Sequence, residues 1–384
     1  MKKIFLAILL FSSVVANAHT VNVRLLSTMN VMAVNVSVNE GPYQLFLDGR
    51  LQPDSLTKKV MQILVINDSL EIRIPGDTVG RYATVWLVNL SDTASFKIKP
   101  IKPSSGTRIY DHTLRLSVLN KSMFCQNDVD LEHYVAGVVE SESGSRTTKE
   151  FYKVQAILCR TYALAHLYRH TQEGFELCDG VHCQAYRSRP TDPNVLLAVE
   201  ETAGLVVVDK NLTLITAAFH SNCGGQTASS GDVWAVSLPY LRSVKDTFCL
   251  NMPNARWQRK IAKDDWLNYL SLKHKYPVDD SVACYNALNM TQDTRSAYYV
   301  YGNIRIPYKT IRSDWGLRSA YFSIEEGKDS IIINGRGYGH GVGLCQEGAI
   351  RMANLGYSYV DILQFYYKDV DIVNLSRLEF FKGE

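Results

Sequence analysis

Residues 131–165 read LEHYVAGVVESESGSRTTKEFYKVQAILCRTYALA, and at this stretch the chain changes from a β-rich to a helical pattern. We predict a short helix over Leu131 to Val139. Thr147 and Thr148 are suited to cap a longer helix, which should run from about Lys149 to His170. Apolar side chains recur along it every three to four residues, the period of a helix with one buried face.

Before this stretch, residues 19 to about 125 alternate apolar and polar side chains, as half-buried strands do. Val21 to Leu25 and Leu70 to Ile74 are examples, and Asp48-Gly49 is a turn signal between such runs. The stretch from Lys97 to Ser105 contains two prolines and reads as a linker or a long turn. We therefore expect a β-rich N-terminal region over residues 19–105.

Beyond the opening stretch, helices and strands are mixed, which predicts an α+β protein. We expect a helix over 193–201 that ends at Gly204, strands over 205–208, 214–219 and 331–333, and helices over 345–355 and 359–367. Ser358 is a candidate cap for the last helix. Residues 250–310 show no clear period.

The bulk composition narrows the class of protein. The chain has 384 residues, of which 46% are hydrophobic and 21% charged, so a folded core is expected. A net charge of +3 is too weak to indicate a nucleic-acid partner.

The N-terminus has the pattern of an export signal. Lys2 and Lys3 precede an apolar run that ends in Ala16-Asn17-Ala18, a small-x-small cleavage site. We expect a signal peptide over residues 1–18 and a mature chain without a transmembrane segment, located in the periplasm, outside the cell or in the cell envelope. An uncleaved anchor is the alternative.

One carboxylate and one arginine stand out in the opening stretch. Glu142 lies at the end of the first predicted helix beside apolar residues, which would raise its pKa and suit it to general acid catalysis. Arg160 lies within the second helix and could orient that carboxylate or a substrate oxygen. Taken alone, the residues favour a plainer interpretation, with Glu142 as a solvated carboxylate at a helix end and Arg160 in a structural ion pair. Glu140 is a rival for the acid.

Four potential metal ligands follow within fourteen residues: His170, Cys178, His182 and Cys183. Two thiolates and two imidazoles make a tetrahedral zinc site. The spacing differs from that of zinc fingers, and a Cys178–Cys183 disulfide is the main alternative.

Alternating glycines mark the C-terminal part, at 335, 337, 339, 341 and 343. No dinucleotide or phosphate-loop register fits them, so we expect no organic cofactor. Alternating glycines instead allow close approach of the backbone to a ligand or to a neighbouring segment.

These motifs together resemble the SpoIID/LytB family. The matching segments are Tyr134 to Glu142, Gln155 to Ala163, Leu177 to Gln184, Phe219 to Thr227, Pro239 to Asp246 and Gly339 to Gly356. The resemblance covers roughly residues 110–373, and implies a SpoIID-like catalytic domain over 106–384 around a central cleft. The chain departs from the family pattern after Glu142, where Ser143 and Gly144 stand in place of Met and Pro, at Cys159 in place of Ala, and at Cys345 in place of Ser.

The resemblance also implies an activity. Family members with lytic activity cleave the MurNAc–GlcNAc bond of peptidoglycan as lytic transglycosylases, often on strands stripped of stem peptides. Carried over by position, Glu142 is the acid/base and Arg160 the essential arginine. His220, Tyr240, His340 and Gln346 would line the cleft and bind substrate.

The resemblance strengthens the expectation of a structural Zn²⁺ held by the His/Cys cluster. Some relatives are instead amidase enhancers, which bind wall glycan and activate a partner amidase. A non-catalytic binding protein of that kind is the alternative function, and a purely structural envelope protein is the third reading.

Overall fold

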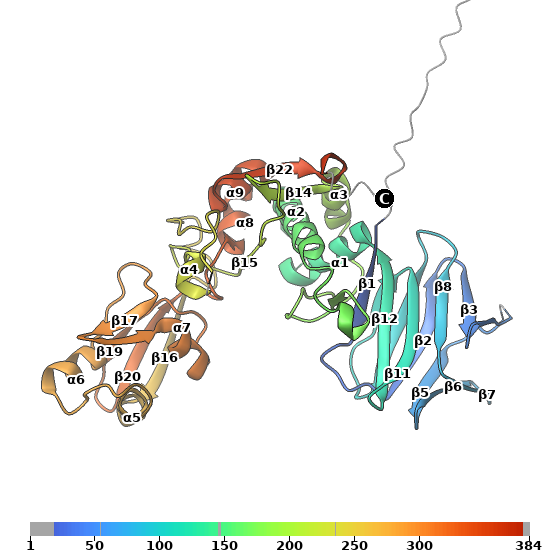
Figure 1. Cartoon of the computed structure of the whole chain (residues 1–384), viewed down its shortest axis with the longest axis horizontal. Helices are drawn as coiled ribbons and strands as arrows, with labels where there is room; N and C mark the ends of the chain where they lie inside the picture. The colour runs from blue at the N-terminus through green and yellow to red at the C-terminus, as the bar shows by residue number, and fades with distance from the viewer. Residues whose placement is uncertain (1–18, 54, 145–146, 235, 379–384) are drawn as a thin grey trace, which may run out of the picture. The chain divides into compact units, whose positions relative to one another are not determined.

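The computed structural model describes residues 19–53, 55–144, 147–234 and 236–378 (Figure 1). The predicted signal peptide, residues 1–18, lies outside the described residues. No helix in the described part of the chain combines the length and the apolar character needed to cross a bilayer. The chain folds into two compact units. The first comprises the described residues up to Leu25 with those of Asn30–Tyr134, and the second comprises Leu26–Met29 with the described residues from Val135 onward.

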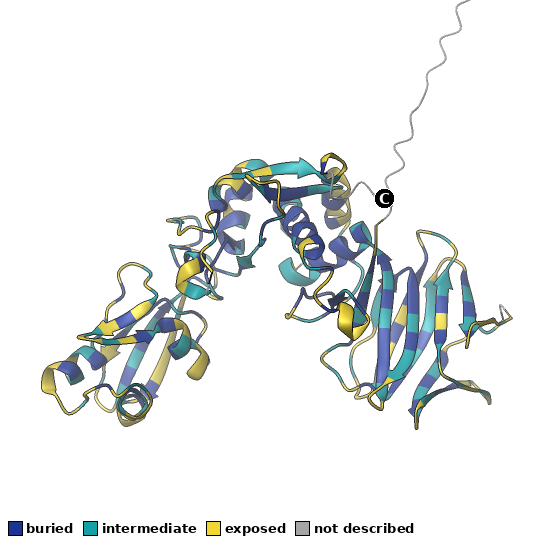
Figure 2. Ribbon diagram, viewed as in Figure 1, coloured by how far each residue is buried: buried dark blue, intermediate teal, exposed yellow. Residues whose placement is uncertain are grey.

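The first unit consists of two antiparallel sheets. One sheet runs in the order β1 (Thr20–Leu25), β12 (Ser122–Asp130), β11 (Thr113–Leu119), β8 (Val85–Asn89), β3 (Tyr43–Leu47), β4 (Arg50–Leu51). The other runs in the order β10 (Arg108–Asp111), β9 (Ser95–Lys102), β2 (Ala33–Glu40), β5 (Met61–Ile66), β6 (Ser69–Ile74), β7 (Asp77–Tyr82). Alternate side chains of the strands are buried, as in β5, so each sheet turns one apolar face inward (Figure 2). The predicted β-rich N-terminal region is confirmed.

This β unit extends further than the sequence suggested. The expected boundary lay at residue 105, yet the unit continues to Tyr134. The reason is long-range strand pairing: β10 pairs with β9, and β12 pairs with β1 over Thr20–Leu25. Sequence periodicity predicts strands but not the partners of strands, so it did not assign residues 106–130 to this unit.

Helices form the centre of the second unit. The central helix α2 (Lys149–Ala165) packs against α3 (Pro193–Glu201), α8 (Gln346–Asn354), α9 (Tyr359–Tyr366) and strand β14 (Leu205–Asp209). Twelve of its seventeen residues are buried, which explains its near-continuous apolar sequence. Helix α1 (Leu131–Ser143) precedes it, and β14 pairs with β22 (Val370–Asn374).

A further part of the second unit has its own apolar core. Strands β16 (Arg256–Ala262), β20 (Ser330–Arg336) and β19 (Phe322–Glu326) form an antiparallel sheet. The helices α5 (Lys263–His274), α6 (Ser281–Leu288) and α7 (Tyr308–Asp314) and the hairpin β17 (Tyr298–Tyr301) and β18 (Ile304–Pro307) accompany it. Trp266, Tyr276 and Phe322 lie in its core. The sequence had shown no clear period over much of this region.

The predicted helices and strands agree with the structure in part. The α+β class is confirmed, α3 has the predicted bounds, and Thr148 caps α2 by accepting from the backbone N–H of Phe151. Helix α2 ends at Ala165, earlier than the predicted His170. The predicted strand over 214–219 is wrong, since only β15 (Phe219–His220) is a strand there, paired in parallel with β21 (Leu344–Cys345).

Candidate functional site

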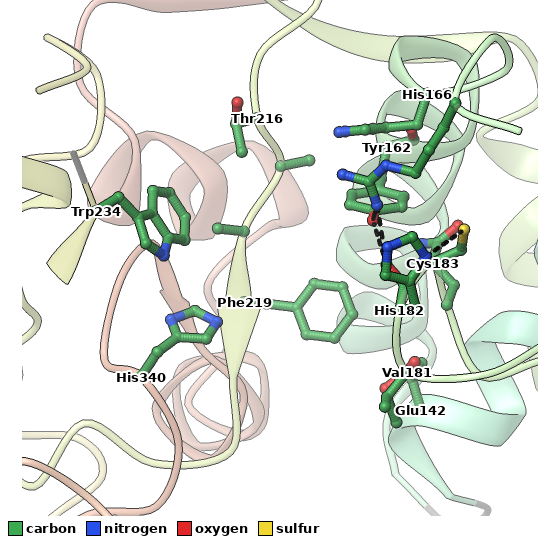
Figure 3. A pocket seen from close by; sticks show the side chains of 14 residues that line it. Glu142, Tyr162, His166, Val181, His182, Cys183, Thr216, Phe219, Trp234 and His340 are labelled. Carbon is green, nitrogen blue, oxygen red and sulfur yellow. Dashed lines mark hydrogen bonds between the residues drawn. The ribbon is translucent and has the colours of Figure 1, made fainter. Parts of the chain in front are cut away.

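The second unit contains a cavity of about 600 Å³. Its lining residues come from α1, from the end of α2, from β15, from the end of α4 (Ser230–Val233) and from the loops that follow α2, β14 and β20: Glu142, Tyr162, His166, Arg169, Val181, His182, Cys183, Gln184, Thr216, Ala217, Ala218, Phe219, Trp234 and His340 (Figure 3). Three residues that the sequence had singled out for different reasons, Glu142, His182 and His340, therefore share one cavity.

Glu142 lies in the last turn of α1, and its carboxyl group faces the cavity. Oε1 accepts a hydrogen bond of 2.7 Å from the backbone N–H of Ala185. Burial raises the pKa of Glu142, and the Ala185 bond and the charge of Arg187 lower it by smaller amounts. A carboxyl group with a raised pKa retains its proton closer to neutral pH, which is the property a general acid requires.

Glu140 was the second candidate for the catalytic acid in the sequence, but its carboxyl group is engaged elsewhere in the structure. Its Oε2 accepts from the backbone N–H groups of Thr191 and Asp192 at 2.7 and 2.9 Å, and Oε1 accepts from the Thr191 hydroxyl at 2.8 Å. Glu140 does not belong to the lining of the cavity. It anchors the loop before α3, so the geometry favours Glu142.

Arg160 is fully buried within α2. Its Nη1 donates to the backbone carbonyl of Leu205 at 2.9 Å, at the start of β14. Arg160 does not line the cavity, and it lies next to Cys159, whose thiol is close enough to feel the charges of both Glu142 and Arg160. The hydrogen bond to Leu205 connects α2 to β14 outside the lining of the cavity.

The end of α2 contributes an aromatic and basic wall that sequence reasoning missed. The rings of Tyr162 and His166 stack with centroids 4.1 Å apart. Arg169 donates to the Tyr162 hydroxyl at 2.8 Å and to the carbonyl of His182 at 2.9 Å. Tyr162, His166 and Arg169 are spaced at i, i+4 and i+7, and this helical stripe of polar-tipped side chains was the available signal.

The opposite side of the cavity carries Trp234, His340 and Phe219 (Figure 3). The ring centroids of Trp234 and His340 are 5.7 Å apart. Burial, together with the nearby charges of Arg312 and Arg295, lowers the pKa of His340 to about 4. His340 is consequently neutral at physiological pH and can take part in hydrogen bonds without adding charge.

The other three predicted substrate contacts do not line the cavity. His220 is buried, with Nδ1 3.2 Å from the carbonyl of Val342. Tyr240 is buried as well, and its hydroxyl accepts from the N–H of Thr216, a lining residue, at 2.9 Å. Gln346 donates from Nε2 to the backbone carbonyl of Glu142 at 3.4 Å. Tyr240 and Gln346 thus hold the backbone of two lining residues, and the ring of His220 lies 5.6 Å from that of the lining residue His340.

The glycine-rich loop approaches its neighbours closely, as the sequence suggested. Gly343 has a φ of +72°, and a Cβ there would collide with the carbonyl oxygen of Ala218. Leu344 then donates to that same carbonyl at 3.0 Å, which fixes the loop beside the segment that carries Phe219.

The four His/Cys residues come together at the edge of the cavity. One ligand atom from each of His170, Cys178, His182 and Cys183 lies within 4.8 Å of all the others. The Cys183 sulfur is 3.4 Å from His170 Nε2 and 3.8 Å from His182 Nδ1, which are close to the edges of a zinc tetrahedron, about 3.3–3.8 Å.

The surroundings of this cluster also suit a metal. His170 Nδ1 donates to Glu173 Oε1 at 2.5 Å, which turns Nε2 toward the cluster. A carboxylate on the far nitrogen of a histidine is the usual support of a metal ligand. Asp179 accepts from Leu26, Ser27 and the Ser27 hydroxyl, which holds the loop between Cys178 and Cys183. The donor set therefore fits Zn²⁺.

Comparisons with known proteins find a family model and several relatives that match this chain. The sequence model of a family described as "Stage II sporulation protein" (SpoIID) matches residues 120–208. An uncharacterized protein of Brachyspira hyodysenteriae is 27% identical over 374 residues, which cover 94% of this chain and 95% of the relative. Stage II sporulation protein D of Bacillus amyloliquefaciens is 30% identical over 261 residues, covering 64% of this chain and 74% of the relative. The amidase enhancer of Bacillus subtilis is 29% identical over 292 residues, which are 60% of this chain and 39% of that protein.

Proposed function

Because the chain belongs to the SpoIID family, we propose that it acts on the glycan strands of peptidoglycan as a lytic transglycosylase, with Glu142 as the acid/base. The observation that carries the proposal is the position of Glu142: a carboxyl group with a raised pKa in a cavity that aromatic rings line on two sides. Among the described residues that line this cavity, Glu142 carries the only carboxyl group.

The walls of the cavity suit a carbohydrate. Aromatic rings offer flat apolar faces to sugar rings while their polar edges remain free for hydrogen bonds. Tyr162 and His166 provide one such surface, and Trp234 provides another. Arg169 adds a positive charge beside them, which can hold the lactyl carboxylate of a MurNAc unit that lacks a stem peptide.

A single carboxyl group is sufficient for the proposed reaction. Glu142 first protonates the glycosidic oxygen between MurNAc and GlcNAc, and the C1–O bond breaks. As carboxylate it then accepts the proton of the MurNAc 6-hydroxyl, whose oxygen bonds to C1 and closes a 1,6-anhydro ring. Hydrolysis would require a second carboxylate to activate water or to form a covalent intermediate. The Ala185 N–H supports the ionised state between the two steps.

Arg160, His220, Tyr240 and Gln346 have supporting roles in this proposal. Gln346 holds the carbonyl of Glu142 and thereby the end of α1, and Tyr240 holds the loop at Thr216. Arg160 and His220 stabilise the inner side of the walls. His340 contacts substrate directly, as a neutral imidazole.

We further propose a structural Zn²⁺ held by His170, Cys178, His182 and Cys183. Four protein ligands complete a tetrahedron, so the ion would stabilise the loop over 170–183 and take no part in the reaction. His182 and Cys183 also line the cavity, and the cluster would therefore fix the wall beside Glu142. Export to the cell envelope through a signal peptide is part of the same proposal.

The test uses the purified chain from His19 onward and peptide-free glycan strands. Mass spectrometry should detect 1,6-anhydro-MurNAc ends with the unmodified chain and with Glu140→Gln, but not with Glu142→Gln. Glu140→Gln is the matched control, because it makes the same change two residues away outside the cavity. Equal product from Glu142→Gln would refute the assignment.

The alternative is supported by the amidase enhancer among the relatives. A binding protein of that kind would use the same aromatic walls without the acid. If the unmodified chain and Glu142→Gln both bind the strands and neither releases fragments, the binding function is the better description.

A further inference from the structure

A second cluster of potential metal ligands lies in the second unit, away from the His/Cys cluster described above. Cys223, Asp246, Cys249 and Cys345 each contribute one atom, and all four atoms lie within 4.8 Å of one another. All four residues are buried. They come from three segments: the loop after β15, which carries Cys223, the segment before β16, which carries Asp246 and Cys249, and the end of β21.

The spacing within this second cluster is about 0.3–0.4 Å tighter than the edges of a zinc tetrahedron, and far wider than a disulfide. The sulfurs of Cys223 and Cys249 are 3.4 Å apart, and the Cys223 sulfur is 3.2 Å from Asp246 Oδ2. Ligands at zinc–sulfur and zinc–oxygen bond lengths lie about 3.5–3.8 Å apart along the edges of a tetrahedron. A disulfide would require about 2.05 Å between two sulfurs, and it would leave the third thiol and the carboxylate unused.

Backbone N–H groups point at two of the sulfurs. Cys345 Sγ accepts from the N–H of Cys223 at 3.2 Å and from that of Gly348 at 3.4 Å. The backbone of Gly225 also hydrogen-bonds to the sulfur of Cys249. Such bonds favour the thiolate, the form in which cysteine binds metal.

The carboxylate is oriented in the same way. Asp246 is completely buried, and its Oδ2 accepts from the hydroxyl of Tyr366 at 3.0 Å while Oδ1 accepts from the N–H of Phe248 at 2.9 Å. A Cβ at Gly348 would collide with both the Tyr366 hydroxyl and Asp246 Oδ2. Glycine at position 348 thus allows the first turn of α8 to approach the carboxylate.

A buried cation lies close to these anions. The Nε and Nη2 atoms of Arg295 are buried and have no hydrogen-bond partner among the described residues. Burial lowers the pKa of Arg295 to about 10, and the charges of Cys223 and Cys345 oppose this by smaller amounts. A positive guanidinium offsets part of the excess negative charge that three thiolates and a carboxylate would place around a divalent ion.

We propose that Cys223, Asp246, Cys249 and Cys345 bind a second structural Zn²⁺. Three thiolates select a soft or borderline ion, and the carboxylate oxygen favours Zn²⁺ over Cu⁺. With four protein ligands no position remains open for a substrate, so the ion connects segments rather than reacting.

The connected segments are the ones that support the second wall of the cavity. Cys345 pairs with His220 in the β15–β21 ladder, and Phe219 in the same strand lines the cavity. Cys345 is also the N-cap of α8, the helix that begins with Gln346. The second ion would hold this wall as the first holds the wall around His182. This inference concerns metal content and is independent of the reaction proposed for Glu142.

Metal analysis of the full purified chain tests the proposal. Elemental analysis should find two zinc ions per chain in the unmodified protein, one in Cys249→Ser and one in Cys178→Ser. Cys284→Ser is the matched control and should keep two, since Cys284 lies on α6 outside both clusters. Circular dichroism checks that each variant is folded.

A second measurement decides the question if Cys249→Ser does not fold. Asp246→Asn retains the three thiols, the acceptor for Phe248 and the shape of the side chain, and should release one of its two zinc ions to a chelator at least tenfold more readily than the unmodified chain. A zinc content that Cys249→Ser and Asp246→Asn leave unchanged, or a Cys223–Cys249 disulfide in the unreduced digest of the unmodified chain, would overturn the proposal. Iron or copper in the second cluster would overturn the choice of zinc.

Discussion

Replacing Glu142 with glutamine should separate catalysis from stability. The amide oxygen of glutamine can still accept the 2.7 Å hydrogen bond from Ala185, so the local structure is preserved. The variant loses only the transferable proton. General acid–base catalysis contributes about 10²- to 10⁴-fold to a rate. No other lining residue among those described has a carboxyl group to replace it, so we expect the loss to fall within this range.

Although Glu142→Gln should lower the rate, it should raise the stability of the protein at neutral pH. Burial raises the pKa of Glu142 in the folded chain, so the folded state binds the proton more tightly than the unfolded state does. The stability that the Glu142 carboxyl group contributes is fully present below its pKa in the unfolded chain, about 4.3. It is lost as the pH rises through the higher pKa that this group has in the folded chain. Glutamine has no such dependence. The unfolding free energy of Glu142→Gln relative to the unmodified chain should therefore increase from pH 4 to pH 7.

The assay pairs product analysis with urea unfolding at several pH values. Release of 1,6-anhydro-MurNAc ends from peptide-free strands gives the rate, and the unfolding midpoint gives the stability. Glu140→Gln provides the comparison, and it should keep the rate of the unmodified chain. A Glu142→Gln variant that retains more than about a tenth of the rate would contradict the assigned role. A relative stability that does not vary with pH would contradict the raised pKa.

Three other changes test separate parts of the site. Trp234→Ala should weaken binding of glycan strands by about 1–2 kcal/mol, some five- to thirtyfold, because a stacking surface of the cavity is removed. Titration with defined glycan fragments measures the affinity, and an unchanged affinity would exclude Trp234 from the binding surface. Glu173→Ala should weaken zinc binding at the His/Cys cluster about 10- to 100-fold, since His170 loses the carboxylate at 2.5 Å that orients its ring. Competition with a chelator measures the zinc affinity, and an unaltered affinity would argue against a metal at this cluster. Gly137→Ala should destabilise the fold by about 1–3 kcal/mol, because its Cβ would collide with the ring of Tyr186; thermal unfolding measures it, and an unchanged midpoint would mean that the ring can move aside.

Local signals in the sequence predicted local structure well. Pro193 after Asp192 and Ser358 before Tyr359 are helix-start signals, and α3 and α9 begin at the expected residues. A cap acts through hydrogen bonds within one turn, so the sequence around it contains most of the information.

Structure that depends on distant partners was not predictable in the same way. The segment over 214–219 has strand-like residues, yet the N–H of Thr216 bonds to the hydroxyl of Tyr240 rather than to a neighbouring strand. The core around Trp266 and Phe322 is assembled from residues up to 72 positions apart in sequence, from Ile261 to Ile333, and α5 shows little amphipathic pattern of its own. Tertiary packing, rather than periodicity, decides such regions.

In the candidate site, too, the sequence predicted some features and not others. Glu142 and His340 were predicted from motifs and do line the cavity, whereas Tyr240 and Gln346 came from the same motifs and lie behind it. A motif records which residues a site needs but does not distinguish a group that touches substrate from one that positions another group. That distinction depends on side-chain direction, which only the fold determines.

The two cysteine clusters have a common physical explanation in how the cavity is built. Apart from Glu142 and Tyr162, most of its lining residues lie on loops or on the short strand β15, and such segments hold side chains less firmly than long helices and strands do. A reaction that uses one carboxyl group twice needs the sugar held within a fraction of an ångström in both steps. Metal ligation at His182 and Cys183 would restrain one wall, and ligation at Cys345 would restrain the segment paired with His220 on the other. If both ions are structural, removing either should lower the rate without changing how the rate depends on the protonation of Glu142. A shift in that pH dependence on removal of one ion would instead mean that the ion acts on the acid itself.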